Sequence, residues 1–193
     1  MITNETSQVL DQPKLIDATI ATINTKLLTS LSWLGNAYGR CKRRRPAKDD
    51  SVRPKYRPTV PGQGLEEIVL FPDQHLGNHC FFYLLDGHEI NADVSVMKPT
   101  ARTRGSIIFW YDIRDVYPSD WATRNDMNVA RDVLEILRTM TVQRSVLVWT
   151  AIHVEPQNVY AGFSWEQVDE IHYMRPKGCF RIEGIFFHDE ARC

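Results

Sequence analysis

The sequence has few of the features that mark a secreted, membrane-spanning or disulfide-bonded protein. Its four cysteines are scattered and form no C-x-x-C pair, so they indicate reduced thiols rather than a disulfide framework. No apolar run approaches the ~18 residues of a bilayer-spanning helix. Residues 1–13 lack the basic and apolar regions of a secretory signal. We therefore expect a soluble protein that is made, and at first kept, in a cytoplasm.

Motifs of the common catalytic and nucleotide-binding sites are also missing. The chain contains no G-x-x-x-x-G-K-[ST], no G-x-G-x-x-G and no G-x-S-x-G. His75 and His79 have the i, i+4 spacing of a helical metal site, but a Gly-Asn pair between them favours a turn. Asp112 and Asp115 follow an apolar run, where some nucleases keep carboxylates, yet no E-x-K pattern follows. We expect no enzymatic activity, no cofactor and no metal.

What the chain does contain is material for a core. Its 193 residues fit one domain, 43% of them are hydrophobic, and aromatic residues often stand side by side. The net charge is −1, so no field of one sign surrounds the whole molecule. The sequence predicts a single domain over residues 1–193, with an N-terminal tail over 1–12 and the sheet and its helices over 65–188.

A long helix is predicted over residues 13–39. Apolar residues recur there at steps of three and four, and Pro13 suits a first helical turn while Gly35 or Gly39 suits a stop. The stripe consists of Ile16, Ile20, Ile23, Leu27, Leu31 and Leu34. A second helix is predicted around residues 127–140, with Thr123 or Asn125 as its N-cap.

Short apolar or alternating runs predict strands over 68–71, 81–85, 90–96, 107–116, 145–155 and 179–187. Asp86-Gly87-His88 indicates a hairpin turn, and residues 97–105 indicate a loop. The run from 107 is apolar on both faces and should be central, and 145–155 should be buried. Ser164 and Gln167 form the pattern of a capping box, which predicts a short helix to about Tyr173. The expected fold class is α+β, a mixed and largely antiparallel sheet with helices on one face.

A basic, proline-rich segment over residues 40–64 separates the first helix from the strands. Residues 40–57 contain nine positive and two negative charges, a net charge of +7. We expect an extended projecting arm, with a short strand near Tyr56. It could dock on an acidic protein surface, contact nucleic acid, or remain a solvated loop. The candidate interface residues are Arg40, Lys42, Arg43, Arg44, Arg45, Arg53, Lys55, Tyr56 and Arg57.

The order of motifs resembles a family of known proteins. The segments on which this resemblance rests are LSWLGNAYGRCKRR, YRPTVPGQGLEEIVLFPDQHLGNHCFF, SIIFWYDIRDVYP and NVYAGFSWEQVDEIHYMRPKGCFRIEGIFF. Over about residues 14–188 the chain resembles small structural proteins encoded by Bacteroides phages and prophages, including the crAss-like phages. The pieces are patterns of packing and turns, so they point to a family more than to an activity.

The resemblance implies a virion subunit, either a head–tail connector or a tail terminator, that forms an oligomeric ring in the neck or tail. It implies contacts with neighbouring portal, connector or tail ring proteins and possible contact with phage DNA. The arm over 40–64 is then expected to order on assembly and to contact an adjacent subunit or the ring above. The alternative is a nucleic-acid-binding accessory protein that uses the basic segment 40–57.

Overall fold

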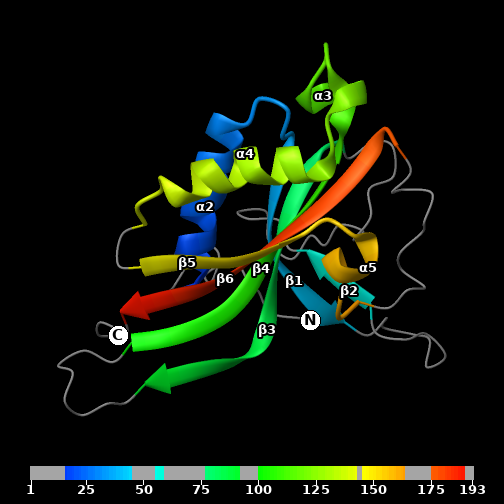
Figure 1. The fold of residues 1–193 in the computed structure, drawn as a ribbon. Helices are drawn as coiled ribbons and strands as arrows, with labels where there is room; N and C mark the ends of the chain where they lie inside the picture. Colours follow the sequence, from blue (N-terminus) through cyan, green and yellow to red (C-terminus); the bar gives the residue numbers. More distant parts are fainter. Residues whose placement is uncertain are drawn as a thin grey trace, which may run out of the picture.

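The chain folds into one twisted sheet with helices packed on it, in agreement with the predicted α+β class (Figure 1). A computed structural model describes residues 16–44, 55–58, 77–91, 100–142, 145–163 and 175–189. The order of elements is α2 (Ile16–Ser30), β1 (Asn36–Arg44), β2 (Lys55–Pro58), β3 (His79–Asn91), β4 (Thr100–Asp112), α3 (Ile113–Val116), a 3-10 turn (Trp121–Thr123), α4 (Asp126–Arg138), β5 (Ser145–His153), α5 (Pro156–Val159) and β6 (Lys177–Asp189).

The sheet has the strand order β2-β1-β3-β4-β6-β5. β1 runs parallel to β3, and every other pairing is antiparallel, so the sheet is mixed and largely antiparallel as predicted. β4 lies between β3 and β6 and pairs with β6 along its whole length, which confirms the predicted central strand. The last described strand, β6, is thus an inner strand, and β5 forms one edge.

The main core lies between one face of the sheet and the helices α2 and α4. Residues alternate between the two faces of a strand, so β4 sends Ile107, Phe109 and Tyr111 into this core. The ring of Phe109 stacks on that of Phe180 from β6, with centroids 4.5 Å apart. The two longer helices therefore share one face, as predicted.

A second, smaller core lies on the opposite face under α5 and the turn that follows it. It contains Phe81, Ile108 and Trp110 from the sheet, covered by Tyr160 and Phe163. Arg181 is buried beneath this cover and donates a hydrogen bond of 3.1 Å to the carbonyl of Ala161. The prediction of helices on one face thus holds for the longer helices, and α5 adds partial cover on the other.

Helix α4 forms as its sequence predicts. Asn125 is the N-cap, and its side chain accepts a hydrogen bond of 3.1 Å from the backbone N–H of Asn128. The side chain of Asn128 in turn accepts a hydrogen bond of 3.0 Å from the backbone N–H of Asn125, which completes a capping box. The buried stripe is Val129, Ala130, Val133, Leu134 and Leu137.

The first helix is shorter than predicted, because it ends at Ser30 and not at residue 39. Leu31 and Leu34 are buried as the stripe requires, but they lie in a turn. The backbone N–H groups of Gly35 and Asn36 both donate to the carbonyl of Asn78, which turns the chain into β1. Pairing with β3 therefore replaces the last turns of the predicted helix.

Several predicted strand boundaries are wrong. Asp86-Gly87-His88 is not a hairpin, since β3 continues to Asn91 with a register irregularity between Leu84 and His88. β4 begins at Thr100 inside the predicted loop 97–105 and ends at Asp112, because residues 113–116 of the predicted strand 107–116 form helix α3. The predicted strand at 68–71, the part of 90–96 beyond Asn91 and the capping box at Ser164 lie outside the described residues.

Candidate interaction surfaces

The predicted basic arm is in part a two-stranded ribbon. β1 contains four of the candidate residues, Arg40, Lys42, Arg43 and Arg44. β2 contains three more, Lys55, Tyr56 and Arg57. The two strands pair antiparallel, in the register Cys41↔Pro58, Lys42↔Arg57, Arg43↔Tyr56 and Arg44↔Lys55. Arg45 and Arg53 lie outside the described residues. The strand predicted near Tyr56 is confirmed. Arg40 pairs with Phe82 of β3, whereas residues 41–44 pair with β2, and the projecting arm over 40–64 stays a prediction.

Arg40, the first residue of the basic cluster, forms an ion pair within the chain. Its Nε lies 2.7 Å from Oδ1 of Asp17, and its Nη2 donates to Oδ2 at 2.8 Å. This two-point contact joins β1 to α2. The side chain of Asn24, also on α2, donates to the carbonyls of Ala37 and Tyr38 at 3.3 and 3.2 Å. The base of the ribbon is thus attached to the first helix.

The opposite edge of the sheet has an apolar character. β5 alternates between half-buried and exposed positions, so it is an edge strand and not the buried strand that its apolar composition predicted. Val146 is 63% exposed and Val148 is 44% exposed. Their partners across the β5–β6 pair are Phe187 and Ile185, both half-buried. We call these four residues the β5–β6 row.

The β5–β6 row continues one face of the sheet beyond the cover supplied by α5. On β6 the same face presents Arg181 and then Glu183, with an Arg181 Nη2 to Glu183 Oε1 distance of 2.8 Å. Burial lowers the pKa of the Arg181 guanidinium from its usual value, and Glu183 partly offsets this. Across from Ile185 lies the exposed Arg104 on β4. The row is therefore apolar at its centre and charged at its border.

The two aspartates at the end of β4 are structural. Asp112 caps α3 and accepts hydrogen bonds from Arg114 and from Lys177, the latter at 2.8 Å. Burial alone would raise the pKa of Asp112, but these hydrogen bonds outweigh it and hold the pKa well below its ordinary value. Asp115 accepts a hydrogen bond of 2.9 Å from the side chain of Asn78. Neither carboxylate points to a shared ion site.

His79 is the member of the predicted histidine pair that the structure describes. It is buried at the start of β3, with its ring among those of Tyr38, Phe81 and Trp110. Burial lowers its pKa to about 4, so the ring is neutral at physiological pH. Within the described ranges no three His, Cys, Asp or Glu residues are placed to share a metal ion. His75 falls outside those ranges.

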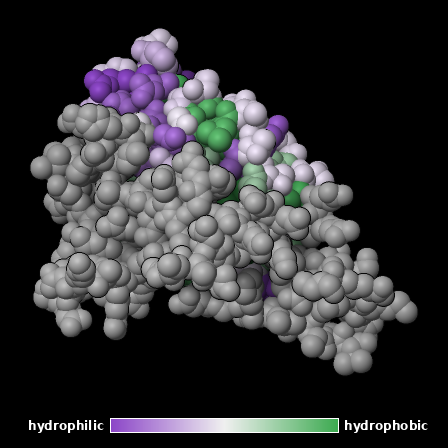
Figure 2. Space-filling view, turned by 180° about the vertical axis from the view of Figure 1, so that it is seen from behind, coloured by the Kyte–Doolittle hydropathy of each residue, from purple (hydrophilic) through white to green (hydrophobic). Residues whose placement is uncertain are grey.

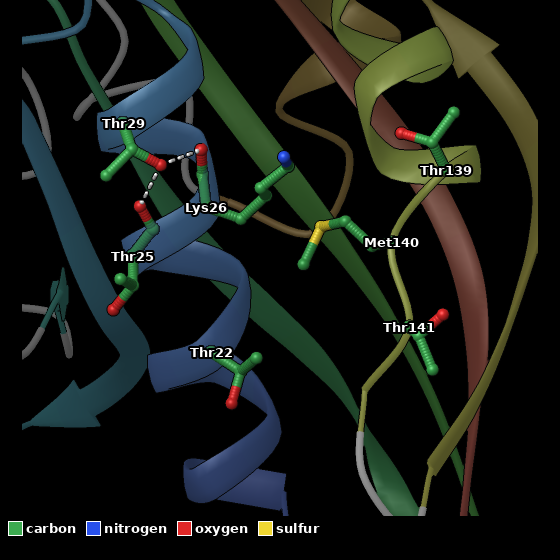
Figure 3. A pocket seen from close by; sticks show the side chains of 7 residues that line it. All are labelled: Thr22, Thr25, Lys26, Thr29, Thr139, Met140 and Thr141. Atoms are coloured by element: carbon green, nitrogen blue, oxygen red, sulfur yellow. Dashed lines mark hydrogen bonds between the residues drawn. The ribbon is translucent and has the colours of Figure 1, made fainter.

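A shallow hollow of about 500 Å³ lies between α2 and the turn after α4 (Figure 3). Lys26 and Met140 extend toward each other across it, and threonines form its walls. The hydroxyls of Thr22, Thr25 and Thr29 donate to carbonyls of their own helix. The hydroxyl protons of these three threonines are therefore already used, and Lys26 is the charged residue among those that line the hollow. These lining residues do not supply a convergent set of polar groups for a ligand.

Figure 2 shows the opposite side of the molecule from Figure 1. The described surface nearest the end with α3 is largely hydrophilic, and apolar residues form a small patch beside it. Among the helices in the described residues, none has the length and apolarity to cross a bilayer.

No protein-family model matches this chain, and no curated protein matches it significantly.

The sequence pointed to the basic ribbon but not to the β5–β6 row. The run SVLVWTAIH is apolar enough to predict an inner strand, so the exposure of Val146 and Val148 was not expected. The available signal was the alternation of Leu147 and Trp149 with these valines, since the larger side chains face the core.

Proposed function

We propose that this chain is a structural subunit that assembles with further copies of itself into a ring, as a connector or tail terminator in the neck or tail of a phage virion. The observation that carries the proposal is the β5–β6 row, an apolar surface on an open sheet edge. The resemblance of residues 14–188 to small phage structural proteins supports the same conclusion.

The edge position of β5 favours assembly for two reasons. An edge strand presents backbone N–H and C=O groups that can pair with a strand of another chain. Proteins that remain monomeric usually protect such an edge with charges, proline or a bulge. The pairing of β5 has an irregularity between Trp149 and Ala151, but before it Val146 and Val148 occupy exposed positions. Burying these valines with Ile185 and Phe187 would add apolar contact to the backbone pairing.

A ring also requires that each copy use two different surfaces, because a head-to-tail contact closes by rotation. The sheet has two unlike edges, the apolar one at β5 and the basic one at β2. A β5 edge that paired with the β5 edge of a second copy would instead give a closed twofold dimer. The unlike edges support the head-to-tail arrangement.

Light scattering behind a sizing column, over a range of protein concentrations, with electron microscopy of the main peak, tests this proposal. We expect rings of one defined size for the native chain and smaller species for Val146→Lys/Val148→Lys. The control is Leu28→Lys, which places one such charge on another exposed apolar residue, on α2. A native chain that is monomeric or a twofold dimer at every concentration, or a double variant that still forms rings, would overturn it.

A further inference from the structure

We infer that the β1–β2 ribbon binds the phosphate backbone of double-stranded DNA. This inference does not depend on ring formation, since it concerns one face of the ribbon and not the backbone edge of β2 that a head-to-tail contact would use. It rests on the pairing register of the two strands, which the sequence alone did not provide.

The register gathers four cationic positions on one face of the ribbon. In an antiparallel pair, directly opposed residues lie on the same face, and so do residues two apart along a strand. Lys42 opposes Arg57 and Arg44 opposes Lys55, so these four positions form a two-by-two array. Its spacing is about 7 Å along a strand and about 5 Å across the pair.

This array disfavours the ribbon itself. Like charges directly opposite each other destabilise a strand pair, whereas alternating signs would stabilise it. Neither β1 nor β2 contains an Asp or a Glu, and the intervening residues 45–54 contribute two acidic residues against three basic ones. A strand pair built this way gains stability when an external polyanion lies against the array, because the phosphates neutralise both cation pairs.

The attachment of the ribbon makes it suitable for this role. Arg40 is held by Asp17 and so does not belong to the array, but its contact fixes the start of the ribbon to α2. The side chain of Asn24 holds the backbone of β1 at two further carbonyls. A ribbon anchored at its base loses less conformational freedom on binding than a free basic tail.

Duplex DNA fits this surface better than the other polyanions. A two-stranded ribbon can lie in the major groove, and Lys and Arg side chains contact phosphates without reading the base sequence. Single-stranded nucleic acid is bound mainly by stacking on aromatic residues, and Tyr56 is the one aromatic residue in the paired segments 41–44 and 55–58. We therefore expect binding without strong sequence preference.

Fluorescence anisotropy of a labelled duplex, titrated with the full chain at several salt concentrations, tests the inference. For four phosphate contacts, the logarithm of the binding constant should fall with the logarithm of salt concentration at a slope of about −3 to −4. Replacing Lys42, Arg44, Lys55 and Arg57 by Gln should weaken binding at least about tenfold at low salt and flatten the slope.

Two controls keep the result interpretable. Arg131→Gln/Arg138→Gln removes two exposed cations from α4 and should leave binding unchanged. The fourfold Gln variant should melt at the same temperature as the native chain or higher, since it removes opposed like charges. The two-residue variant Lys42→Gln/Arg57→Gln, which removes one opposed pair, should lie between the native chain and the fourfold variant in affinity and slope.

Three outcomes would overturn the inference. The native chain could fail to bind duplex at low salt, or the ribbon and α4 variants could lose affinity equally. Alternatively, polyglutamate could compete with the duplex as strongly, charge for charge, as an unlabelled duplex does. That last result would show that the ribbon recognises an acidic protein surface instead of a phosphate backbone.

Discussion

Lys177 on β6 donates a hydrogen bond of 2.8 Å to Asp112 at the end of β4, and the two residues are also directly opposed in the strand register. Arg114 contacts the same carboxylate from α3, at 2.7 Å. The side chain of Asp112 is 6% exposed, so this carboxylate is buried at one end of the central strand pair, whereas the side chains of Arg114 and Lys177 that contact it remain partly exposed to solvent.

The first prediction concerns the acid stability that follows from this contact. The pKa of Asp112 is lower in the folded chain than in the unfolded one, so its stabilising effect is complete above about pH 4 and is lost as pH falls through the folded pKa. Asp112→Ala should lower the free energy of unfolding at pH 7 by about 1–3 kcal/mol and reduce its dependence on pH in acid.

Urea unfolding monitored by circular dichroism at pH 7 and in acid measures both effects. Asp120→Asn is the control, because Asp120 forms an exposed i, i+4 pair with Arg124 and should contribute up to about 0.5 kcal/mol. Equal losses in the two variants would show that burial of Asp112 has no energetic importance.

The second prediction concerns Asp126, which begins α4 and accepts a hydrogen bond from Tyr111. Its pKa shift has the opposite direction to that of Asp112. Burial raises the pKa of Asp126, which the Tyr111 contact partly offsets. The folded state therefore binds the proton more tightly, and stability falls as pH rises from about 4 through the raised pKa. Asp126→Asn should remove this fall and leave the chain as stable as the native one, or more so, at pH 7.

Thermal unfolding across a pH series checks this expectation. Tyr111→Phe is the opposing variant, because loss of the hydrogen bond leaves the ionised carboxylate less well solvated and should destabilise the chain more at pH 7 than at pH 4. If Asp126→Asn melted with the same pH profile as the native chain, Asp126 would not be the titrating group.

The third prediction concerns Gly178 in β6, directly opposite Tyr111. A methyl group at this position would lie within 3.0 Å of the Tyr111 ring and also collide with Asp126. Gly178→Ala should therefore destabilise the chain by about 1–3 kcal/mol, as overpacking does elsewhere. Gly35→Ala is the matched control, since its methyl group would meet the carbonyl of Asn78 at an ordinary 3.4 Å. Comparable melting temperatures for both variants would contradict the prediction.

The elements that could be predicted from the sequence are those whose local signals agree with their tertiary surroundings. Helix α4 has an apolar stripe and Asn125, one of the two candidate N-caps, so its buried face and approximate start followed from the residues. The alternation of Phe180, Ile182 and Phe186 likewise identified the core face of β6. Where local pattern and packing coincide, one sequence is sufficient.

The errors arose where long-range pairing overrode a local signal. The apolar stripe of the first helix continues to Leu34, but β1 gains a partner in β3 by leaving the helix at Ser30. Asp86-Gly87 is a turn signal, yet the continuous partner strand β4 holds it within β3 as an irregularity. The first helix and β3 lie far apart in sequence, and Asp86-Gly87 is held in its strand by pairs with β4 such as His88↔Thr103, so no pattern within either segment could reveal the outcome.

The two candidate surfaces likewise combine features that follow from local sequence with features that depend on long-range pairing. Composition identified the basic cluster, but the register that opposes Lys42 to Arg57 depends on how the two strands pair. The removal of Arg40 from that cluster depends on Asp17, which is 23 residues away. The β5–β6 row needed the strand order, because an apolar strand becomes an interaction surface only when it lies at an edge.

The strand order has a consequence for the synthesis of this chain on the ribosome. β6 is the last described strand to be made, yet it fills the position between β4 and β5. Until residues 177–189 leave the ribosome exit tunnel, β4 and β5 each lack a neighbour, and the rings that pack on Phe180 have no counterpart. The sheet of the nascent chain therefore stays incomplete during this interval, with apolar surface of β4 and β5 uncovered. This is the interval in which a chaperone would have most exposed surface to protect.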